Sequence, residues 1–266
     1  MKIGFYGTGN MGKAIINGIV NAKIALAQDI YISDLNKELV NQLIEELNVV
    51  EKDQSNIAKE VDVLILAVKP NIIPIVLEAN KASLNNNTII VSIAAGVSIK
   101  SIEDIVGDKQ PIVRIMPNTP ALVNEGMSAL CFNESISSSQ QEQVISIFNS
   151  FGKAEVVAEN LIDAVVGVSG SAPAYVYIFI EALADGAVLC GMPRAQAYEF
   201  AAQTVLGSAK MVLETGMHPG ALKDNVCSPG GTTIAAVSSL EQDGFRKAVI
   251  NAVQAAALKN EAMGKK

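Results

Sequence analysis

Near the C-terminus, a short stretch combines small hydroxyl side chains with paired glycines: Ser228, Pro229, Gly230, Gly231, Thr232 and Thr233. An apolar run with helical periodicity follows, so these residues stand at a predicted helix start. The first N–H groups of a helix have no partner inside it and lie at the positive end of its dipole, which suits an anion. The stretch could also act only as a helix cap. Two consecutive glycines are costly in a mere cap, because glycine loses the most backbone entropy on folding. The pattern therefore favours an anion site.

A second stretch that could bind a ligand lies near the N-terminus. There a strand-like run at 2–7 leads into Gly7, Thr8, Gly9, Asn10, Met11 and Gly12. This G-x-G-x-x-G pattern between a strand and a helix is typical of a Rossmann-type dinucleotide site. Gly7 permits the tight turn, Gly9 lets the backbone approach a pyrophosphate, and Gly12 allows the helix to pack closely on the strand. All six residues are predicted to contact the cofactor.

Ser33 and Asp34 end the next strand-like run, and Asp34 lies 22 residues beyond Gly12. An acid at this distance is placed to bond the adenosine ribose hydroxyls. Its charge would repel a 2′-phosphate, which favours NADH over NADPH. Ser33 and Lys37 could still receive a phosphate. Alternatively, Asp34 or Asn36 could serve only as the N-cap of the following helix.

Other residues at strand ends complete the predicted cofactor site: Ala67, Val68 and Lys69, then Ala94, Ala95 and Gly96, then Asn118, with Asn56 as a further contact. In an open α/β sheet the ligand lies beyond the carboxyl ends of the strands, and the small residues leave room for ribose and nicotinamide. Asn118 could bond the nicotinamide carboxamide. Each of these segments could instead be an ordinary turn.

Composition excludes several function classes. The net charge is −7 with no basic stripe, which argues against nucleic-acid binding. There is a single histidine, His218, which we expect to cap or pack rather than to join a catalytic triad. The three cysteines are far apart, which argues against a disulfide framework or a metal site and fits a reducing compartment. No apolar run is long enough to predict a membrane span, and the chain starts directly with a strand-like run, so the cytoplasm is the expected location.

The elements that position these residues can be predicted from the hydrophobic pattern, which divides the chain into two parts. Residues 1–160 alternate strand-like runs at 2–7, 30–33, 61–68, 88–94, 111–116, 127–132 and 154–158 with helical patterns at 10–22, 36–47, 71–80, 98–105 and 137–150. Continuous apolar strands alternating with helices predict a parallel sheet covered on both faces, an α/β Rossmann-type domain.

Residues 161–266 differ, with alanine-rich helical patterns at 172–192, 193–214 and 244–264. These helices are apolar on more than one stripe and must be buried. We therefore predict an all-α substrate-binding and dimerisation domain that builds a homo-oligomer from dimers.

Several longer motifs resemble the pyrroline-5-carboxylate reductase family: SPGGTTIAAVSSLE (228–241), MPNTPALVNEG (116–126), ENLIDAVVGVSGSAPAYVY (159–177) and GFRKAVINAVQAA (244–256). The resemblance covers essentially the whole chain. It implies reduction of the cyclic imine 1-pyrroline-5-carboxylate to L-proline with NADPH or NADH, the last step of proline biosynthesis. Family members commonly use NADPH, whereas Asp34 favours NADH.

The resemblance also implies roles for individual residues. The anion held at 228–233 would be the substrate carboxylate, bound by Ser228, Gly231, Thr232 and Thr233. Thr233 would act as the catalytic residue by orienting the ring nitrogen with its hydroxyl. Glu159 would line the substrate site, or else be a solvated carboxylate in a linker. Asn225 would contact the cofactor.

The missing base agrees with imine reduction. Where 3-hydroxy-acid dehydrogenases of similar layout carry a lysine, this chain has Val176. Alcohol oxidation needs a base to take the hydroxyl proton, but reduction of a protonated imine does not. Two alternatives stay open: a reductase for another small cyclic imine acid, and a non-catalytic dinucleotide sensor.

Overall fold

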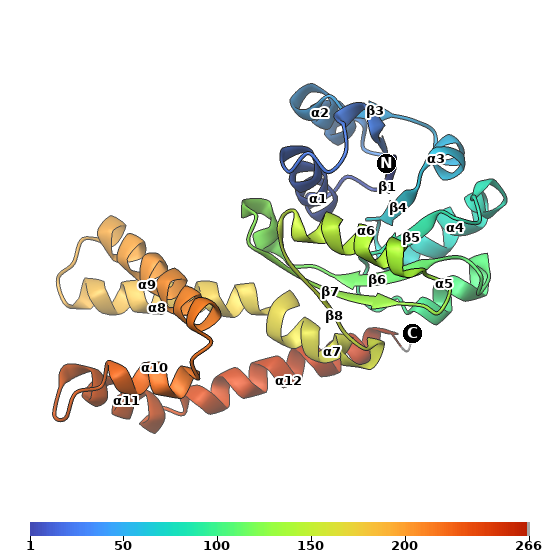
Figure 1. The fold of residues 1–266 in the computed structure, drawn as a ribbon. Coiled ribbons are helices and arrows are strands. Elements are labelled where there is room, and N and C mark those ends of the chain that lie inside the picture. The colour runs from blue at the N-terminus through green and yellow to red at the C-terminus, as the bar shows by residue number, and fades with distance from the viewer. Residues whose placement is uncertain (265–266) are drawn as a thin grey trace. The chain divides into compact units, whose positions relative to one another are not determined.

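The computed structural model describes residues 1–264 of the chain. It divides into two compact units (Figure 1). Unit 1 holds Met1–Ser171 together with the end of the chain from Ala255, and unit 2 holds Ala172–Gln254. Each unit is described by itself.

Unit 1 is built on an eight-stranded sheet of order β3-β2-β1-β4-β5-β6-β7-β8. The strands are β1 (Ile3–Tyr6), β2 (Ile30–Ser33), β3 (Val50–Glu51), β4 (Val63–Leu66), β5 (Ile89–Ser92), β6 (Ile112–Met116), β7 (Gly126–Phe132) and β8 (Gly152–Val156). Strands β1 to β6 are parallel. The chain runs outward from β1 to β3 and then returns to β4 on the other side of β1. The crevice between β1 and β4 is therefore the switch point at which such sheets bind ligands.

The prediction of a parallel sheet is wrong for β7 and β8, which run opposite to the other six strands, because β7 pairs with β6 in the antiparallel direction. Only residues 117–125 join these two strands. A parallel neighbour needs a crossover of about a dozen residues or more, usually a helix. Strand β8 is again parallel to β7, and a helix separates the two in the chain.

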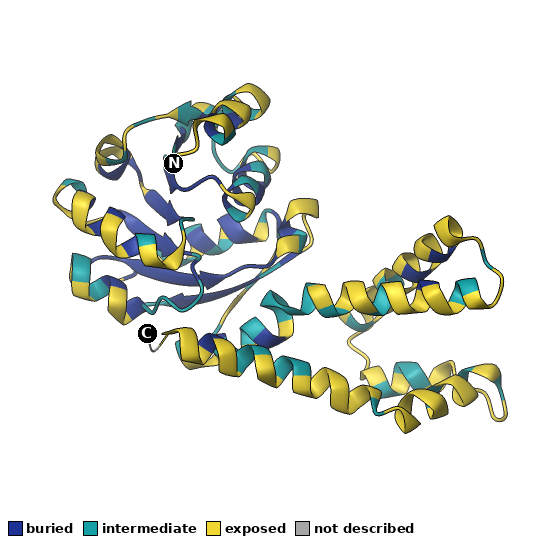
Figure 2. Ribbon diagram, turned by 180° about the vertical axis from the view of Figure 1, so that it is seen from behind, coloured by how far each residue is buried: buried dark blue, intermediate teal, exposed yellow. Residues whose placement is uncertain are grey.

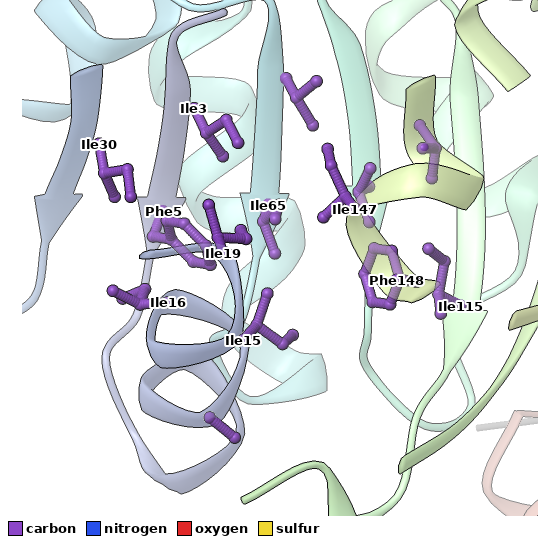
Figure 3. Close-up of a cluster of buried hydrophobic side chains, with 14 of the residues drawn as sticks. Ile3, Phe5, Ile15, Ile16, Ile19, Ile30, Ile65, Ile115, Ile147 and Phe148 are labelled. Carbon is purple, nitrogen blue, oxygen red and sulfur yellow. The ribbon is translucent and has the colours of Figure 1, made fainter. Parts of the chain in front are cut away.

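Helices cover both faces of the sheet. One face carries α1 (Asn10–Asn21), α2 (Lys37–Leu47) and α6 (Ser138–Asn149), and the other carries α3 (Gln54–Glu60), α4 (Ile73–Asn80), α5 (Ile99–Val106) and α7 (Ile162–Val165). Figure 3 shows the first layer, in which Ile15 and Ile16 of α1 lie near Phe5 of β1, and Phe148 of α6 lies beside Ile115 of β6. These five side chains are fully buried.

Short turns complete unit 1: η1 (Ala27–Asp29), η2 (Pro70–Ile72), η3 (Lys81–Ser83), η4 (Thr119–Val123), η5 (Glu159–Leu161) and the π-helical turn η6 (Val166–Gly170). The turn η4 packs against α1 and β7. It therefore links the chain after β6 to the helix that follows the glycine-rich loop.

Unit 2 is all helical, as predicted. Its helices are α8 (Ala172–Leu189), α9 (Arg194–Thr215), α10 (Pro219–Asn225), α11 (Thr232–Gln242) and the first part of α12 (Phe245–Gly264). Helices α8 and α9 pack through alanines, with Ala184, Ala197 and Ala201 buried. Most of the remaining helical surface is exposed (Figure 2), including large apolar side chains such as Ile178 and Phe200.

One helical run, Glu159–Leu189, is long and apolar enough to cross a membrane by length and composition alone. Core helices of soluble proteins pass the same test. The run contains the π-helical turn η6 and the acidic residues Glu181 and Asp185 on α8. An exposed apolar helix of this kind is also typical of a subunit interface.

Candidate dinucleotide and substrate sites

The glycine-rich loop lies at the switch point between β1 and β4. Gly7 has a φ of +98°, and a Cβ there would lie 2.6 Å from the carbonyl oxygen of Ala67. A Cβ on Gly12 would lie 2.8 Å from the carbonyl oxygen of Gly7. A Cβ on Gly9 would meet no atom of the described chain within 4 Å, and no side chain caps α1 at this position. The loop is thus tightly packed on its inner side and open at Gly9, which fits a pyrophosphate at the start of α1.

Asp34 is tied directly to this loop. Its Oδ2 accepts hydrogen bonds from the backbone N–H of Thr8 at 2.6 Å and from the Thr8 hydroxyl at 3.1 Å. Its Oδ1 accepts from the backbone N–H of Asn36 at 2.9 Å. Burial alone would raise the pKa of the Asp34 carboxyl, but the hydrogen bonds from Asn36, Thr8 and Leu35 outweigh burial and lower it. Asp34 is therefore a carboxylate at neutral pH and fixes the loop to the end of β2.

The N-cap of α2 is Asn36, whose side chain accepts from the N–H groups of Glu38 and Leu39. Of the two alternative caps considered for this helix, Asn36 is confirmed and Asp34 is wrong. Lys37, the nearest candidate for a phosphate, is paired with Glu51 of β3. The positive charge closest to Asp34 in sequence is therefore already balanced.

The remaining predicted cofactor residues of unit 1 lie beyond strand ends, in the first turn of α1, or on α3. Ser33 ends β2, and its carbonyl accepts from Gly7 N–H at 2.9 Å. The others are Asn10 and Met11 at the start of α1; Ala67, Val68 and Lys69 after β4; Ala94, Ala95 and Gly96 after β5; and Asn56 on α3. Asn56 lines a hollow of about 500 Å³ with Glu51, Lys52, Asp53 and Glu60. Asn225 belongs to unit 2, where it is the exposed last residue of α10.

Asn118 is buried and already committed to protein partners. Its Nδ2 donates to the carbonyl of Ser169 at 3.2 Å, and its Oδ1 accepts from the N–H of Met127 at 2.8 Å. The side chain thus joins three segments: the end of β6, the start of β7 and the turn η6. Its contact with a carboxamide stays a prediction.

The predicted anion site lies at the start of α11, which begins at Thr232 as expected. Gly230 has a φ of +67°, the left-handed region that favours glycine. Gly231 is the N-cap, and its N–H donates to the carbonyl of Ser228 at 3.0 Å. Gly231 has no side chain with which to cap the helix, so a simple side-chain cap does not account for the motif. The N–H groups of the first turn, from Thr232 onward, present a positive end to an anion.

Glu159 is engaged in unit 1. Its Oε1 accepts from the Nη1 of Arg114 at 2.9 Å and from the N–H of Ile99 at the start of α5, also at 2.9 Å. Arg114 is 8% exposed, so Glu159 balances a buried charge. The alternative of a solvated linker carboxylate is therefore wrong, while a role in substrate binding stays a prediction. Arg114 was not predicted from the sequence, although it is the one charged residue in the apolar run 111–116.

His218 is confirmed as a capping residue. It is the N-cap of α10, and its Nδ1 accepts from the N–H of Gly220 at 3.0 Å. Cys131 is buried, and burial, followed by the charge of Glu159, raises the pKa of its thiol to about 11. A hollow of about 510 Å³ beside Cys131 contains only one of the predicted site residues, Glu159.

Comparisons with known proteins match both ends of the chain to described families. Residues 2–96 match the family "NADP oxidoreductase coenzyme F420-dependent", and residues 159–263 match "Pyrroline-5-carboxylate reductase dimerisation". The chain is 52% identical to the pyrroline-5-carboxylate reductase of Escherichia coli strain K12, covering 99% of this chain and 98% of the relative. It is 45% identical to that of Methanosarcina acetivorans, covering 100% and 98%.

Among solved structures, the pyrroline carboxylate reductase of Plasmodium falciparum with NADP bound superimposes with a TM-score of 0.90 at 37% identity, covering 99% of this chain and 98% of that one. The predicted fold class is confirmed: a Rossmann-type N-terminal part and an all-helical dimerisation part. The match also supports NAD(P)H as the cofactor class.

Proposed function

The chain belongs to the pyrroline-5-carboxylate reductase family, and we propose that it reduces 1-pyrroline-5-carboxylate to L-proline with NAD(P)H, the last step of proline biosynthesis. The first turn of α11 carries the proposal. No side chain of the described residues caps this helix at Gly231, so its first-turn N–H groups suit a substrate with one carboxylate.

In unit 1, the start of α1 binds the pyrophosphate through backbone N–H groups, and Gly9 leaves that approach open. The bound cofactor supplies a hydride. Ala67, Ala94, Ala95 and Gly96 leave room for ribose and nicotinamide, with Thr8, Asn10, Met11, Val68 and Lys69 around them. Asn56 contacts the adenosine half of the cofactor, and Asn225 of α10 is a further cofactor contact. The proposal also assigns residues 1–160 to the dinucleotide-binding domain and residues 161–266 to the substrate-binding and dimerisation domain.

In unit 2, Thr232 and Thr233 donate their N–H groups to the substrate carboxylate, and Gly231 and Ser228 shape the turn around it. The carbon of the protonated C=N bond accepts the hydride, and the π-electron pair of that bond moves to nitrogen. The product amine keeps its proton, so no strong base is required. The Thr233 hydroxyl orients the ring nitrogen. The negative charge of Glu159 favours the iminium cation, and the ion pair with Arg114 reduces this effect.

We propose further that this chain prefers NADH. Asp34 is held ionised by Thr8 and Asn36, and Lys37 is paired with Glu51. The region that a 2′-phosphate would enter therefore has two carboxylates and one ammonium, which disfavours an added negative charge. The NADP bound in the Plasmodium relative is a property of that protein.

The exposed apolar helices of unit 2 support assembly through the dimerisation domain. We propose a homodimer formed by these helices, with larger assemblies built from it, and a cytoplasmic location. A second copy would cover apolar side chains such as Ile178, which is 66% exposed in the single chain.

The test is the initial rate of cofactor oxidation with 1-pyrroline-5-carboxylate, using NADH and NADPH side by side. Thr233→Ala should lower kcat/KM by about 10- to 100-fold, the value of one or two hydrogen bonds in the transition state. Thr233→Ser should retain most of the activity, because it keeps the hydroxyl. Thr204→Ala is the matched control, since the Thr204 hydroxyl bonds the Phe200 carbonyl within α9 and no other group of residues 1–264.

Three outcomes would contradict parts of the proposal. Tight dinucleotide binding without turnover would indicate a sensor. Faster reduction of the six-membered cyclic imine acid would move the substrate assignment to that compound. A higher kcat/KM with NADPH would overturn the cofactor preference and leave the reaction class intact.

A further inference from the structure

Ser169 carries a buried hydroxyl whose Oγ has no hydrogen-bond partner in the described chain. Buried polar groups are almost always paired, so an orphan of this kind calls for a ligand or a water molecule. The residue lies in η6, a π-helical turn, and such turns occur frequently at functional sites. The turn is closed by a hydrogen bond of 2.8 Å from Ser171 N–H to the carbonyl of Val166.

The position of Ser169 is fixed by Asn118. The Asn118 amide donates to the Ser169 carbonyl at 3.2 Å, and Asn118 directly follows the carboxyl end of β6. A Cβ on the next residue, Gly170, would lie 3.8 Å from the sulfur of Met116, the last residue of β6. The turn η6 is therefore held at the carboxyl edge of the sheet.

This part of the edge is where the nicotinamide half of a dinucleotide lies. The pyrophosphate belongs at the switch point between β1 and β4, and Asp34 marks the adenosine half on the β2 side. The other half of the cofactor must extend over β4, β5 and β6. The loop at Ala94–Gly96 follows β5, which is parallel to β6, and so leaves the sheet at the same edge as Asn118.

The polar side chains at this edge differ in what they can still bind. Asn118 uses its Nδ2 on Ser169 and its Oδ1 on Met127. The hydroxyl of Ser92, at the end of β5, accepts from Ala94 N–H at 3.5 Å. The Ser169 hydroxyl alone among these three has no partner, and a hydroxyl can both donate and accept. A carboxamide offers one acceptor and two donors, which matches it.

We propose that the Ser169 hydroxyl hydrogen-bonds the carboxamide of the bound nicotinamide, and that Asn118 positions Ser169 from behind. Ser169 is thus a cofactor-binding residue. In this proposal Ser169, and not Asn118, bonds the carboxamide. This bond limits rotation of the ring and so selects which ring face meets the substrate. The inference rests on the proposed function only in requiring a bound dinucleotide.

The experiment measures dissociation constants by calorimetry, without substrate, for NADH and for ADP-ribose, which lacks the nicotinamide. Ser169→Ala should weaken NADH binding about 5- to 20-fold, the value of one hydrogen bond. It should leave ADP-ribose binding within about twofold, since that ligand cannot reach the hydroxyl. Ser101→Ala is the control, because among the described residues the Ser101 hydroxyl bonds only the Ser98 carbonyl at the start of α5. If NADPH binds more tightly, the matched pair is NADPH and 2′-phospho-ADP-ribose.

Equal weakening of NADH and ADP-ribose would show that Ser169 only supports the fold, and no change in either would show that its hydroxyl is satisfied by water. Both results overturn the proposal. If Ser169→Ala does not fold, the wild type is compared with NAD⁺ and pyridine adenine dinucleotide, in which hydrogen replaces the whole carboxamide. Equal affinity for the two would overturn a bond between the carboxamide and Ser169, and tighter binding of NAD⁺ would support it. Because no turnover is measured, failure of the reductase assignment would leave these results interpretable.

Discussion

The two units of this chain bury their apolar residues to very different extents. In unit 1, isoleucines, valines and phenylalanines from both faces of the sheet are fully buried. In unit 2, the buried cluster consists of Ala184, Ala197 and Ala201, while Ile178, Phe200 and Leu213 are exposed. The first unit is complete as a single chain. The second retains large exposed apolar surfaces, which agrees with its match to a dimerisation family.

The largest effect should come from truncating the core of unit 1. Phe148→Ala should lower the free energy of unfolding by about 3–5 kcal/mol, because Phe148 is fully buried and leaves a cavity. Phe200→Ala is the matched change in unit 2, where the ring is 63% exposed. Denaturant unfolding at two protein concentrations measures both. The loss at Phe148 should not depend on concentration, and a strong dependence there would break the contrast between the units.

The next effect concerns association. Ile178→Asp should weaken the dimer by about 10- to 30-fold, the scale of a buried interface contact replaced by a charge. Ile75→Asp on α4 is the control, because Ile75 is 62% exposed and Ile178 is 66% exposed. Light scattering across a dilution series measures the dissociation constant. Equal effects of the two substitutions would contradict an interface on α8.

A smaller effect should appear as a pH dependence in unit 1. The pKa of Asp34 is lower in the folded state than in the unfolded chain, so its stabilising contribution is present above about pH 4 and is lost as the pH falls through the lowered pKa. Asp34→Asn should therefore melt at a lower temperature than wild type near pH 7, and the difference should shrink at acidic pH. Thr233→Ala removes no ionisable group and should show no such change. Melting curves from pH 2.5 to 7 test this. A difference in melting temperature that does not depend on pH would contradict a stabilising role for the hydrogen bonds from Thr8 to the Asp34 carboxylate.

The smallest effect concerns the rates at which the cysteines of the two units react with a labelling reagent. Cys131 is buried and its pKa is raised to about 11, whereas Cys190 follows α8 and is exposed in the single chain. Iodoacetamide at pH 8 should label Cys190 at least tenfold faster than Cys131, because the thiolate is the reactive form. Mass spectrometry of the labelled peptides gives both rates. Protection of Cys190 that disappears on dilution would place it within the dimer interface, and faster labelling of Cys131 would contradict its burial.

Local patterns in the sequence determined most of the elements and the two motifs. The G-x-G-x-x-G pattern between β1 and α1, and the glycines before α11, depend on backbone geometry within a few residues, which sequence spacing specifies directly. Apolar periodicity predicted the strands of the sheet and the long helices of unit 2, because each pattern reflects which face is buried. The edge strand β3 was missed since it spans only Val50–Glu51.

Only the tertiary structure decided how distant polar groups pair. Asp34 binds Thr8 across 26 positions, Glu159 binds Arg114 across 45, and Asn118 binds Ser169 across 51. The antiparallel direction of β7 likewise follows from how the chain returns to the sheet. Spacing along a chain carries no information about such contacts, because they depend on the packing that brings separate elements together. The sequence therefore identified many of the residues that could do chemistry, but it did not point to Ser169, whose unpaired hydroxyl is visible only in the fold.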